Sequence, residues 1–176
     1  MQLLYLVPEF PSQTHTFFWR EVQALRSRGV DVALVSTRKP PADACRHAFA
    51  AEATRQTRYL FPPHWVRDTV FLCSRPLRVL GAFSYLAGLS ESTWFQRLAA
   101  VPLLLPAANL ARFSLDQGAD HLHVHSFANS AHVAALARIL GGCSYSLTLH
   151  GDLDVYGRDH VSKTRDARFV TCVTAP

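Results

Sequence analysis

The feature that most constrains the fold is a short apolar run followed by a helical period and then a second apolar run. Residues 2–7, QLLYLV, form an apolar stretch bounded by proline, which is typical of a strand buried on both faces. From Thr16 the apolar residues recur at a helical spacing. The face that they share carries Phe18, Val22 and Leu25. Residues 30–36, VDVALVS, predict a second buried strand, so the three segments predict a βαβ unit with parallel strands.

The same alternation continues along the sequence. The further predicted elements are a helix at 42–53, a strand at 57–61, two or three helices within 64–118 joined at 89–94, a strand at 120–126, a helix at 129–142, and strands at 143–150 and 167–174. Asn129 or Ser130 is expected to cap the helix at 129–142. Strands that alternate with helices predict one doubly wound, Rossmann-like α/β domain over residues 1–176, with a mostly parallel sheet.

The composition argues against several classes of protein. The four cysteines are scattered without a C-x-x-C pair, which favours reduced thiols over a zinc knuckle or a disulfide framework. The net charge of +5 comes almost entirely from arginines spread along the chain, so no nucleic-acid partner is expected. Such a basic surface suits anionic lipid headgroups or phosphorylated ligands, and it equally suits plain solubility.

Two apolar segments bear on the location of the protein. The first run ends at Pro8, too early for the apolar segment of a signal peptide, so a cytoplasmic location is expected. Residues 98–111, LAAVPLLLPAANLA, are shorter than the roughly 18 to 20 residues that cross a bilayer. An apolar stripe in this region consists of Trp94, Phe95, Leu98 and Val101. We interpret the stripe mainly as core, with peripheral contact at the inner membrane face as the minority interpretation.

Ligands of doubly wound sheets bind beyond the carboxyl ends of the strands, which here gives three candidate segments, 8–16, 125–129 and 150–156. The first, PEFPSQTHT, contains no glycine, and neither a G-x-G-x-x-G nor a Walker motif occurs in the sequence. A nicotinamide cofactor or a P-loop nucleotide is therefore disfavoured, and no cofactor is expected. The candidate substrate-binding residues of this turn are Ser12, Gln13, Thr14, His15 and Thr16.

The segment HLHVH suggests a metal site as an alternative. Its histidines, His121, His123 and His125, are expected to project from one face of a strand. Residues two apart on a strand are about 6 to 7 Å apart, so two of them can reach one ion but three on a straight strand cannot. A metal-dependent hydrolase therefore remains open beside two other interpretations, an anion or sugar site and histidines with purely structural partners.

The segment HGDLD follows a predicted strand and suggests a second polar site. His150 is the candidate catalytic side chain, and a nearby carboxylate, Asp152 or Asp154, is expected to orient the ring and raise its pKa. The same residues can instead form a polar turn that caps the next helix. No G-x-S-x-G elbow occurs, which gives a serine hydrolase little support.

Three segments together resemble a known family. YLVPEFPSQTHTFFWREVQALRSRGVDVALVS, HLHVHSFANSAHVAALARILGGCSYSLTLHGDLDVY and SKTRDARFVTCVT are similar to successive parts of the amino-terminal domain of family-four glycosyltransferases, of the exopolysaccharide or colanic-acid type. The likeness departs from that pattern at Ser126, which separates a histidine and a phenylalanine that the family has side by side. The family has a GT-B arrangement of two domains, and the carboxyl-terminal, donor-binding domain is absent from residues 1–176.

The resemblance implies transfer of a sugar, with retention and without a metal, from a nucleotide diphosphate sugar to a hydroxyl of a glycan or lipid-linked acceptor. It implies that His150 and Asp152 are catalytic. The substrate-binding residues that it implies are Ser12, Gln13, Thr14, His15, Thr16, His125, Asn129, Asp154 and Lys163. Because the second domain is missing, catalysis by this chain alone is not expected. A non-catalytic sugar- or lipid-binding domain is a further alternative.

Overall fold

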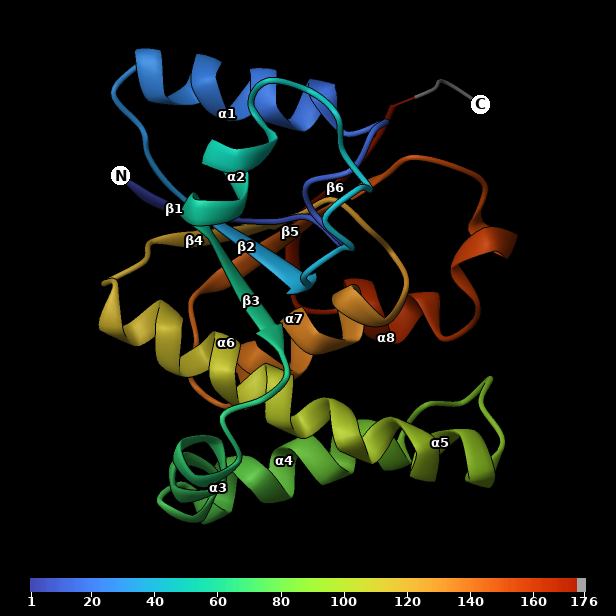
Figure 1. The fold of residues 1–176 in the computed structure, drawn as a ribbon. Coiled ribbons are helices and arrows are strands. Elements are labelled where there is room, and N and C mark those ends of the chain that lie inside the picture. The colour runs from blue at the N-terminus through green and yellow to red at the C-terminus, as the bar shows by residue number, and fades with distance from the viewer. Residues whose placement is uncertain (174–176) are drawn as a thin grey trace.

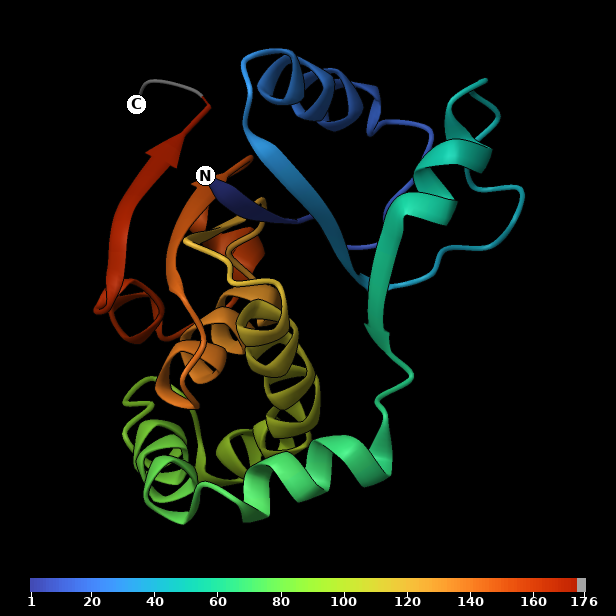
Figure 2. The same cartoon turned by 90° about the vertical axis from the view of Figure 1, so that its left-hand side faces the viewer.

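Six parallel strands form one sheet at the centre of the structure, a computed structural model that describes residues 1–173 (Figure 1). The strands are β1 (Gln2–Leu6), β2 (Asp31–Arg38), β3 (Thr57–Phe61), β4 (His121–Val124), β5 (Ser144–Leu149) and β6 (Ala167–Cys172). Their order across the sheet is β3-β2-β1-β4-β5-β6, with β3 and β6 at opposite edges (Figure 2). Every neighbouring pair is parallel. This confirms the predicted Rossmann-like α/β fold.

Helices lie on both sides of the sheet (Figure 1). One side of the sheet carries α1 (Thr16–Ser27) and α2 (Ala50–Gln56). The other side carries α6 (Leu104–Asp116), α7 (Asn129–Ile139) and α8 (His160–Thr164). Farther from the sheet on that second side lie α3 (Trp65–Cys73), α4 (Pro76–Ala87) and α5 (Trp94–Ala100), with the short 3₁₀ turn η1 (Val101–Leu103) before α6. A second 3₁₀ turn, η2 (Leu153–Tyr156), precedes α8.

Alternating side chains of β1 fill two separate cores, because successive residues of a strand point to opposite faces. Leu4 and Leu6 pack into the larger core with α6 and α7. Leu3, Tyr5 and Val7 pack into a smaller core with α1 and α2. Both cores exclude water almost completely from β1, which explains why its sequence is apolar on both faces.

Three details of the predicted elements are wrong. Segment 64–118 contains four α-helices, α3 to α6, rather than two or three. The predicted helix 42–53 is replaced by turns up to α2, because Arg46 and His47 bond to the turn after β1 instead of to a helix of their own. Residue 128 is the N-cap of α7, so Asn129 and Ser130 lie inside the helix and cap nothing. The joint near 89–94 is confirmed, while residue 174 of the last predicted strand lies outside the described residues.

One continuous helical segment within residues 1–173, Trp94–Asp116, is long and apolar enough to cross a membrane by length and composition. It joins α5, η1 and α6 and is therefore longer than the stretch 98–111 considered from the sequence. Most of α6 is buried against the sheet and neighbouring helices, including Leu104, Leu110 and Ala111. The apolar character of α6 is therefore explained by the core. In α5, by contrast, Trp94, Phe95 and Leu98 are exposed, so the interpretation of that stripe mainly as core is wrong.

Candidate active site at the switch point of the sheet

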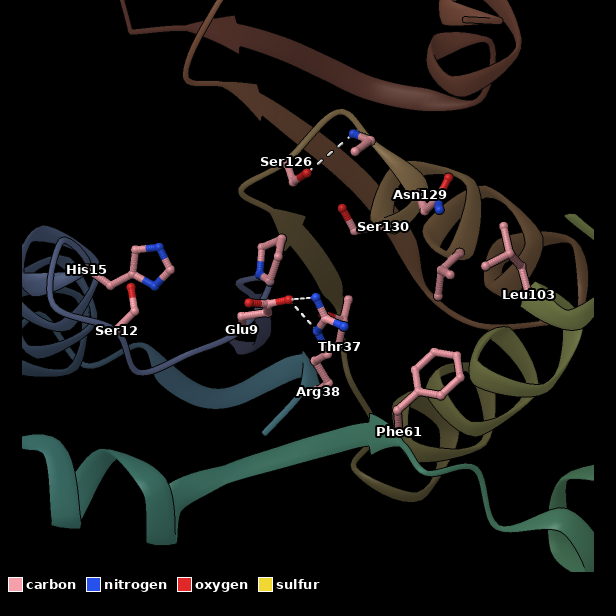
Figure 3. A pocket seen from close by; sticks show the side chains of 13 residues that line it. Glu9, Ser12, His15, Thr37, Arg38, Phe61, Leu103, Ser126, Asn129 and Ser130 are labelled. Carbon is pink, nitrogen blue, oxygen red and sulfur yellow. Dashed lines mark hydrogen bonds and ion pairs between the residues drawn. The ribbon is translucent and has the colours of Figure 1, made fainter. Parts of the chain in front are cut away.

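The strand order reverses between β1 and β4, and a pocket of about 760 Å³ opens beyond the carboxyl ends of the strands there (Figure 3). Its walls come from the loops after β1 and β4, the ends of β2 and β3, the turn η1 and the beginning of α7. The lining residues are Pro8, Glu9, Ser12, His15, Thr37, Arg38, Phe61, Leu103, Ser126, Ala128, Asn129, Ser130 and Val133. The pocket is therefore polar near β1 and α7 and apolar near Phe61 and Leu103.

The five predicted binding residues of the turn after β1 do not all face the pocket. Ser12 and His15 line the pocket, and the backbone N–H of His15 donates to the carbonyl of Ser12 at 3.0 Å. Thr14 is exposed and lines a smaller neighbouring hollow. Gln13 and Thr16 instead bond to the segment before α2, through the backbone N–H of residue 46 at 3.0 Å and the ring of residue 47 at 3.1 Å. These two side chains therefore hold the turn in place.

The amino-terminal end of α7 faces the same pocket. The first N–H groups of a helix have no partner within the helix, and no side chain caps those of α7. The hydroxyl of Ser130 is buried and has no hydrogen-bond partner, while Asn129 is exposed at the rim. The first turn of α7 contains no acidic residue. This end of the pocket is therefore suited to an anionic oxygen.

An ion pair that was not predicted from the sequence lies on one wall of the pocket. Arg38, at the end of β2, is paired with Glu9 of the turn after β1. Glu9 has a positive φ of 50°, in the left-handed region that side chains other than glycine rarely adopt. Figure 3 shows this pair facing Ser126 and Ser130 from the opposite wall. The pocket therefore offers both a cation and an acceptor to a polar ligand.

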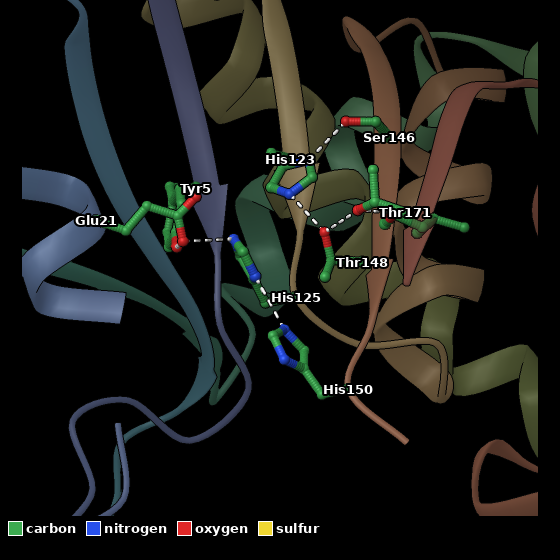
Figure 4. A network of polar contacts seen from close by, with 9 residues as sticks. Tyr5, Glu21, His123, His125, Ser146, Thr148, His150 and Thr171 are labelled. Carbon is green, nitrogen blue, oxygen red and sulfur yellow. Dashed lines mark hydrogen bonds and ion pairs between the residues drawn. The ribbon is translucent and has the colours of Figure 1, made fainter. Parts of the chain in front are cut away.

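Next to the pocket, His125 and His150 form the centre of a second polar cluster (Figure 4). Their rings are joined by a hydrogen bond of 3.1 Å between Nδ1 of His125 and Nε2 of His150. Glu21 of α1 lies with Oε2 4.0 Å from Nε2 of His125, and it accepts a hydrogen bond of 2.6 Å from the hydroxyl of Tyr5. Phe18 packs edge-on against both imidazoles. The cluster thus joins the ends of β4 and β5 to α1.

Burial controls the charge of these imidazoles. Desolvation, together with the neighbouring His123 and His150, lowers the pKa of His125 to about 2. Burial also lowers the pKa of His150, and the carboxylate of Glu21 opposes that effect. Both rings are therefore neutral near pH 7, each with one N–H donor and one acceptor nitrogen. The expectation that an aspartate raises the pKa of His150 is wrong, because the pKa is lowered and the opposing charge comes from Glu21.

The loop after β5 places the remaining predicted residues. Asp152 and Asp154 are both exposed, at the start of η2 and within it. Lys163 is almost fully buried, where its ammonium donates to the carbonyl of Tyr156 at 2.9 Å. The hydroxyl of Tyr156 in turn accepts a 2.9 Å hydrogen bond from the backbone N–H of His150. Lys163 therefore supports the loop from below and does not line the pocket.

Asp159 fixes the far end of this loop. It is buried, adopts a left-handed φ of 61°, and its carboxylate accepts bonds from the backbone N–H of Glu91 at 2.8 Å and from the hydroxyl of Ser92. The carboxylate of Glu91 in turn accepts a hydrogen bond of 2.6 Å from the backbone N–H of Asp159. The loop that begins at His150 is thereby attached to the connection between α4 and α5.

The two other histidines of the HLHVH segment bond to hydroxyl groups of β5. His121 lies 2.8 Å from the hydroxyls of Ser144 and Ser146, and His123 lies 2.7 Å from Ser146 and 2.9 Å from Thr148. Within residues 1–173, no group of three or more His, Cys, Asp or Glu side chains is arranged to hold a metal ion. The hydrolase alternative thus finds no three-ligand site among these histidines.

Some of the residues at the site could have been found from the sequence. Glu21 follows Phe18 by one helical turn, so a helical projection places it on the edge of the buried face of α1. Tyr5 lies on the α1 side of β1 by strand alternation. Their contact with His125 depends on β1 and β4 being neighbours, and that pairing brings together residues about 120 positions apart.

Comparisons with known proteins give no identification. No protein-family model matches the chain, and no curated protein matches it significantly.

Proposed function

We propose that the pocket at the switch point is the acceptor-side half of a glycosyltransferase active site, of the retaining, family-four type that the sequence resembles. The observation that carries the proposal is the position of the uncapped end of α7 and the hydroxyl-bearing turn after β1 on one pocket, beside the His125–His150 pair. The ligand would be a nucleotide diphosphate sugar together with a glycan or lipid-linked hydroxyl, in the cytoplasm.

The phosphate groups of the donor would lie at the amino-terminal end of α7. Free N–H groups and the hydroxyl of Ser130 can donate there, and Arg38 lies on the opposite wall. The sugar would extend towards Ser12 and His15. Hydroxyl, imidazole and carboxylate groups interleaved with aromatic rings are the usual surroundings of a bound sugar, and the site provides all of them.

In the reaction, the bond between the anomeric carbon and the terminal phosphate oxygen breaks, and the acceptor oxygen forms a bond to that carbon. The proton of the acceptor hydroxyl passes to the released diphosphate, so atoms and charges balance. Neutral His150 would donate a hydrogen bond to an oxygen of the transferred sugar, while His125 fixes its ring. Asp152 and Asp154, both exposed, would reach acceptor hydroxyls.

The proposal also includes a second domain that would bring the main cationic partners of the donor. The first experiment is therefore to read the DNA downstream of codon 176 and to express the complete protein if a second α/β domain is encoded. Transfer from a panel of nucleotide sugars is then measured for the parent, for His150→Ala and for Ser130→Ala. We expect transfer to fall about 10²-fold or more for His150→Ala and about 10-fold for Ser130→Ala.

His121→Ala is the matched control, because it removes a histidine of the same sheet face whose bonds go to Ser144 and Ser146 rather than to the pocket. Equal loss of transfer in His121→Ala and His150→Ala would argue against the proposed role of His150. Stoichiometric bound zinc would favour the hydrolase instead. Binding of sugars without any transfer would favour a non-catalytic module.

A further inference from the structure

The outermost helices expose an unusually large set of apolar side chains. We call this surface the outer-layer face. It consists of Trp65, Val66 and Val70 of α3, Leu77, Leu80 and Phe83 of α4, and Trp94, Phe95 and Leu98 of α5. Their exposed fractions range from 45% for Phe83 to 83% for Leu77. Single exposed apolar residues are normal, but nine on three successive helices are not.

These helices are apolar on both sides. Their inward sides pack into the core through Phe71 of α3 and through Ala82 and Leu86 of α4. A helix at a protein–water boundary normally carries a charged outer face, yet α4 has one charged residue, Arg78, and α5 has one, Arg97. The outer sides of α3, α4 and α5 therefore have the composition of a surface that meets a second apolar phase.

The charges around the outer-layer face are mostly positive. Between residues 64 and 100 the sequence contains four arginines, at 67, 75, 78 and 97, and two acids. One acid, Asp68, is buried and paired with Arg112 at 3.1 Å, and the other, Glu91, is bonded to the backbone of Asp159. Among the ion pairs of residues 1–173, none involves Arg67 or Arg78. The remaining charge here is therefore cationic.

The tryptophans are distributed in the same way. Two of the three in the chain, Trp65 and Trp94, lie on the outer-layer face and are 64% and 63% exposed. The third, Trp19, is stacked on Phe49 in the smaller core. An indole ring combines an apolar body with an N–H donor, which favours the boundary between hydrocarbon and headgroups. Exposed tryptophans among leucines and arginines thus match a lipid boundary in both polarity and charge.

We propose that the outer-layer face binds the surface of an anionic lipid bilayer. The apolar side chains enter the boundary between headgroups and acyl chains, and the net positive charge of these helices, with Arg67 outside the ion pairs of the described residues, attracts lipid phosphates. This inference rests on α3, α4 and α5 alone and stands independently of sugar transfer. A protein partner or a second copy of this chain would instead cover the same face without binding to vesicles.

The test is co-sedimentation of the chain with vesicles of phosphatidylcholine alone and of phosphatidylcholine with about 30% phosphatidylglycerol, at low and high salt. We expect binding to the anionic vesicles, weakened by salt because the lipid charge is screened. A blue shift of tryptophan emission should accompany it, since Trp65 and Trp94 would leave water. The double variant Leu77→Ser/Leu80→Ser should bind at least about 10-fold more weakly, because it removes apolar area from the contact.

The matched control is Val155→Ser/Val161→Ser, which removes two equally exposed apolar side chains outside the outer-layer face. It should bind vesicles like the parent. Since all four residues are exposed, circular dichroism is expected to show unchanged folding in both variants. Absence of binding to anionic vesicles, or equal loss in both double variants, would overturn the proposal. The proposal would also be overturned if the parent chain self-associated without binding to vesicles and if Leu77→Ser/Leu80→Ser abolished that self-association.

Discussion

The two halves of the α1-facing side of the sheet are built differently. Over β1 and β2, side chains such as Leu34 are buried beneath α1 and α2. Over β4, β5 and β6, the same side of the sheet carries histidines, serines and threonines with Phe169, and it forms two grooves of about 510 and 580 Å³. We call these the covered half and the open half.

The difference between the covered and the open half follows from the spacing of apolar residues along their strands. β2 reads DVALVSTR and has apolar residues on both faces, whereas β5 reads SYSLTL and alternates polar and apolar. Parallel strands are usually buried on both faces, so alternation within an all-parallel sheet indicates which strands lack a helix on one side. The polar network of His121 and His123 with the hydroxyls of β5 occupies that uncovered surface.

Truncating one apolar residue in each half should give the largest contrast. Leu34→Ala in the covered half, where the side chain is 1% exposed, should lower the free energy of unfolding by about 2–5 kcal/mol. Phe169→Ala in the open half, where the ring is 51% exposed, should cost about 1 kcal/mol or less. Urea denaturation of both variants measures the contrast, and equal losses would show that the open half is packed as tightly as the covered one.

Acid should destabilise the protein through buried histidines on both sides of the sheet. Burial lowers the pKa of His123, in the open half, and of His132, beneath the sheet on α7, to about 4 each, from 6.5. The unfolded chain therefore binds more protons between these values. Stability is fully present above about pH 6.5 and declines as the pH falls towards 4, by about 1–3 kcal/mol for each histidine.

Urea midpoints measured between pH 7.5 and 4 test this expectation, with His123→Gln and His132→Gln as the variants. Each substitution should reduce the slope of stability against pH. If only His132→Gln does so, the ring of His123 is solvated, and the open half is wetter than its contacts with Ser146 and Thr148 indicate.

Tyr5 lies at the border of the two halves, and removing its hydroxyl should have a smaller effect. Burial and the neighbouring Glu21 raise the pKa of Tyr5, so the phenol stays protonated and donates to that carboxylate. Tyr5→Phe should cost about 1 kcal/mol in stability. It should also free Glu21 to approach His125, which nuclear magnetic resonance titration would detect as a higher pKa of that imidazole. An unchanged pKa of His125 would show that the carboxylate of Glu21 does not influence the charge of that imidazole.

The smallest effect on stability is expected at Ser144, the first residue of β5 in the open half. The hydroxyl of Ser144 lies 2.8 Å from Nδ1 of His121, but both side chains are partly exposed, so water can replace the bond. Ser144→Ala should change stability by no more than about 0.5 kcal/mol in the same urea assay. A loss above about 1 kcal/mol would mean that the hydroxyl–imidazole network acts as a cooperative unit.

The fold was largely predictable from sequence because the buried strands are short apolar runs with sharp limits. The helix predicted at 42–53 is wrong although the sequence around Cys45 has a helical pattern. The reason is that His47 bonds to the turn after β1, which is distant in the sequence. The segments of the site were also predictable from the strand ends. Their internal roles were not, because the position of Lys163 beneath the loop and the approach of Glu21 to His125 depend on tertiary packing.

The bond network of Asp159 gives the outer helices a mechanical connection to the site. The carboxylate joins the α4–α5 connection to the end of the loop that starts at His150, so any displacement of α5 pulls on that loop through a buried, charge-assisted contact. A protein anchored by its outer helices would therefore transmit the position of the anchor to the position of His150. In such an arrangement, attachment to a surface and the position of the loop would be coupled through the carboxylate of Asp159.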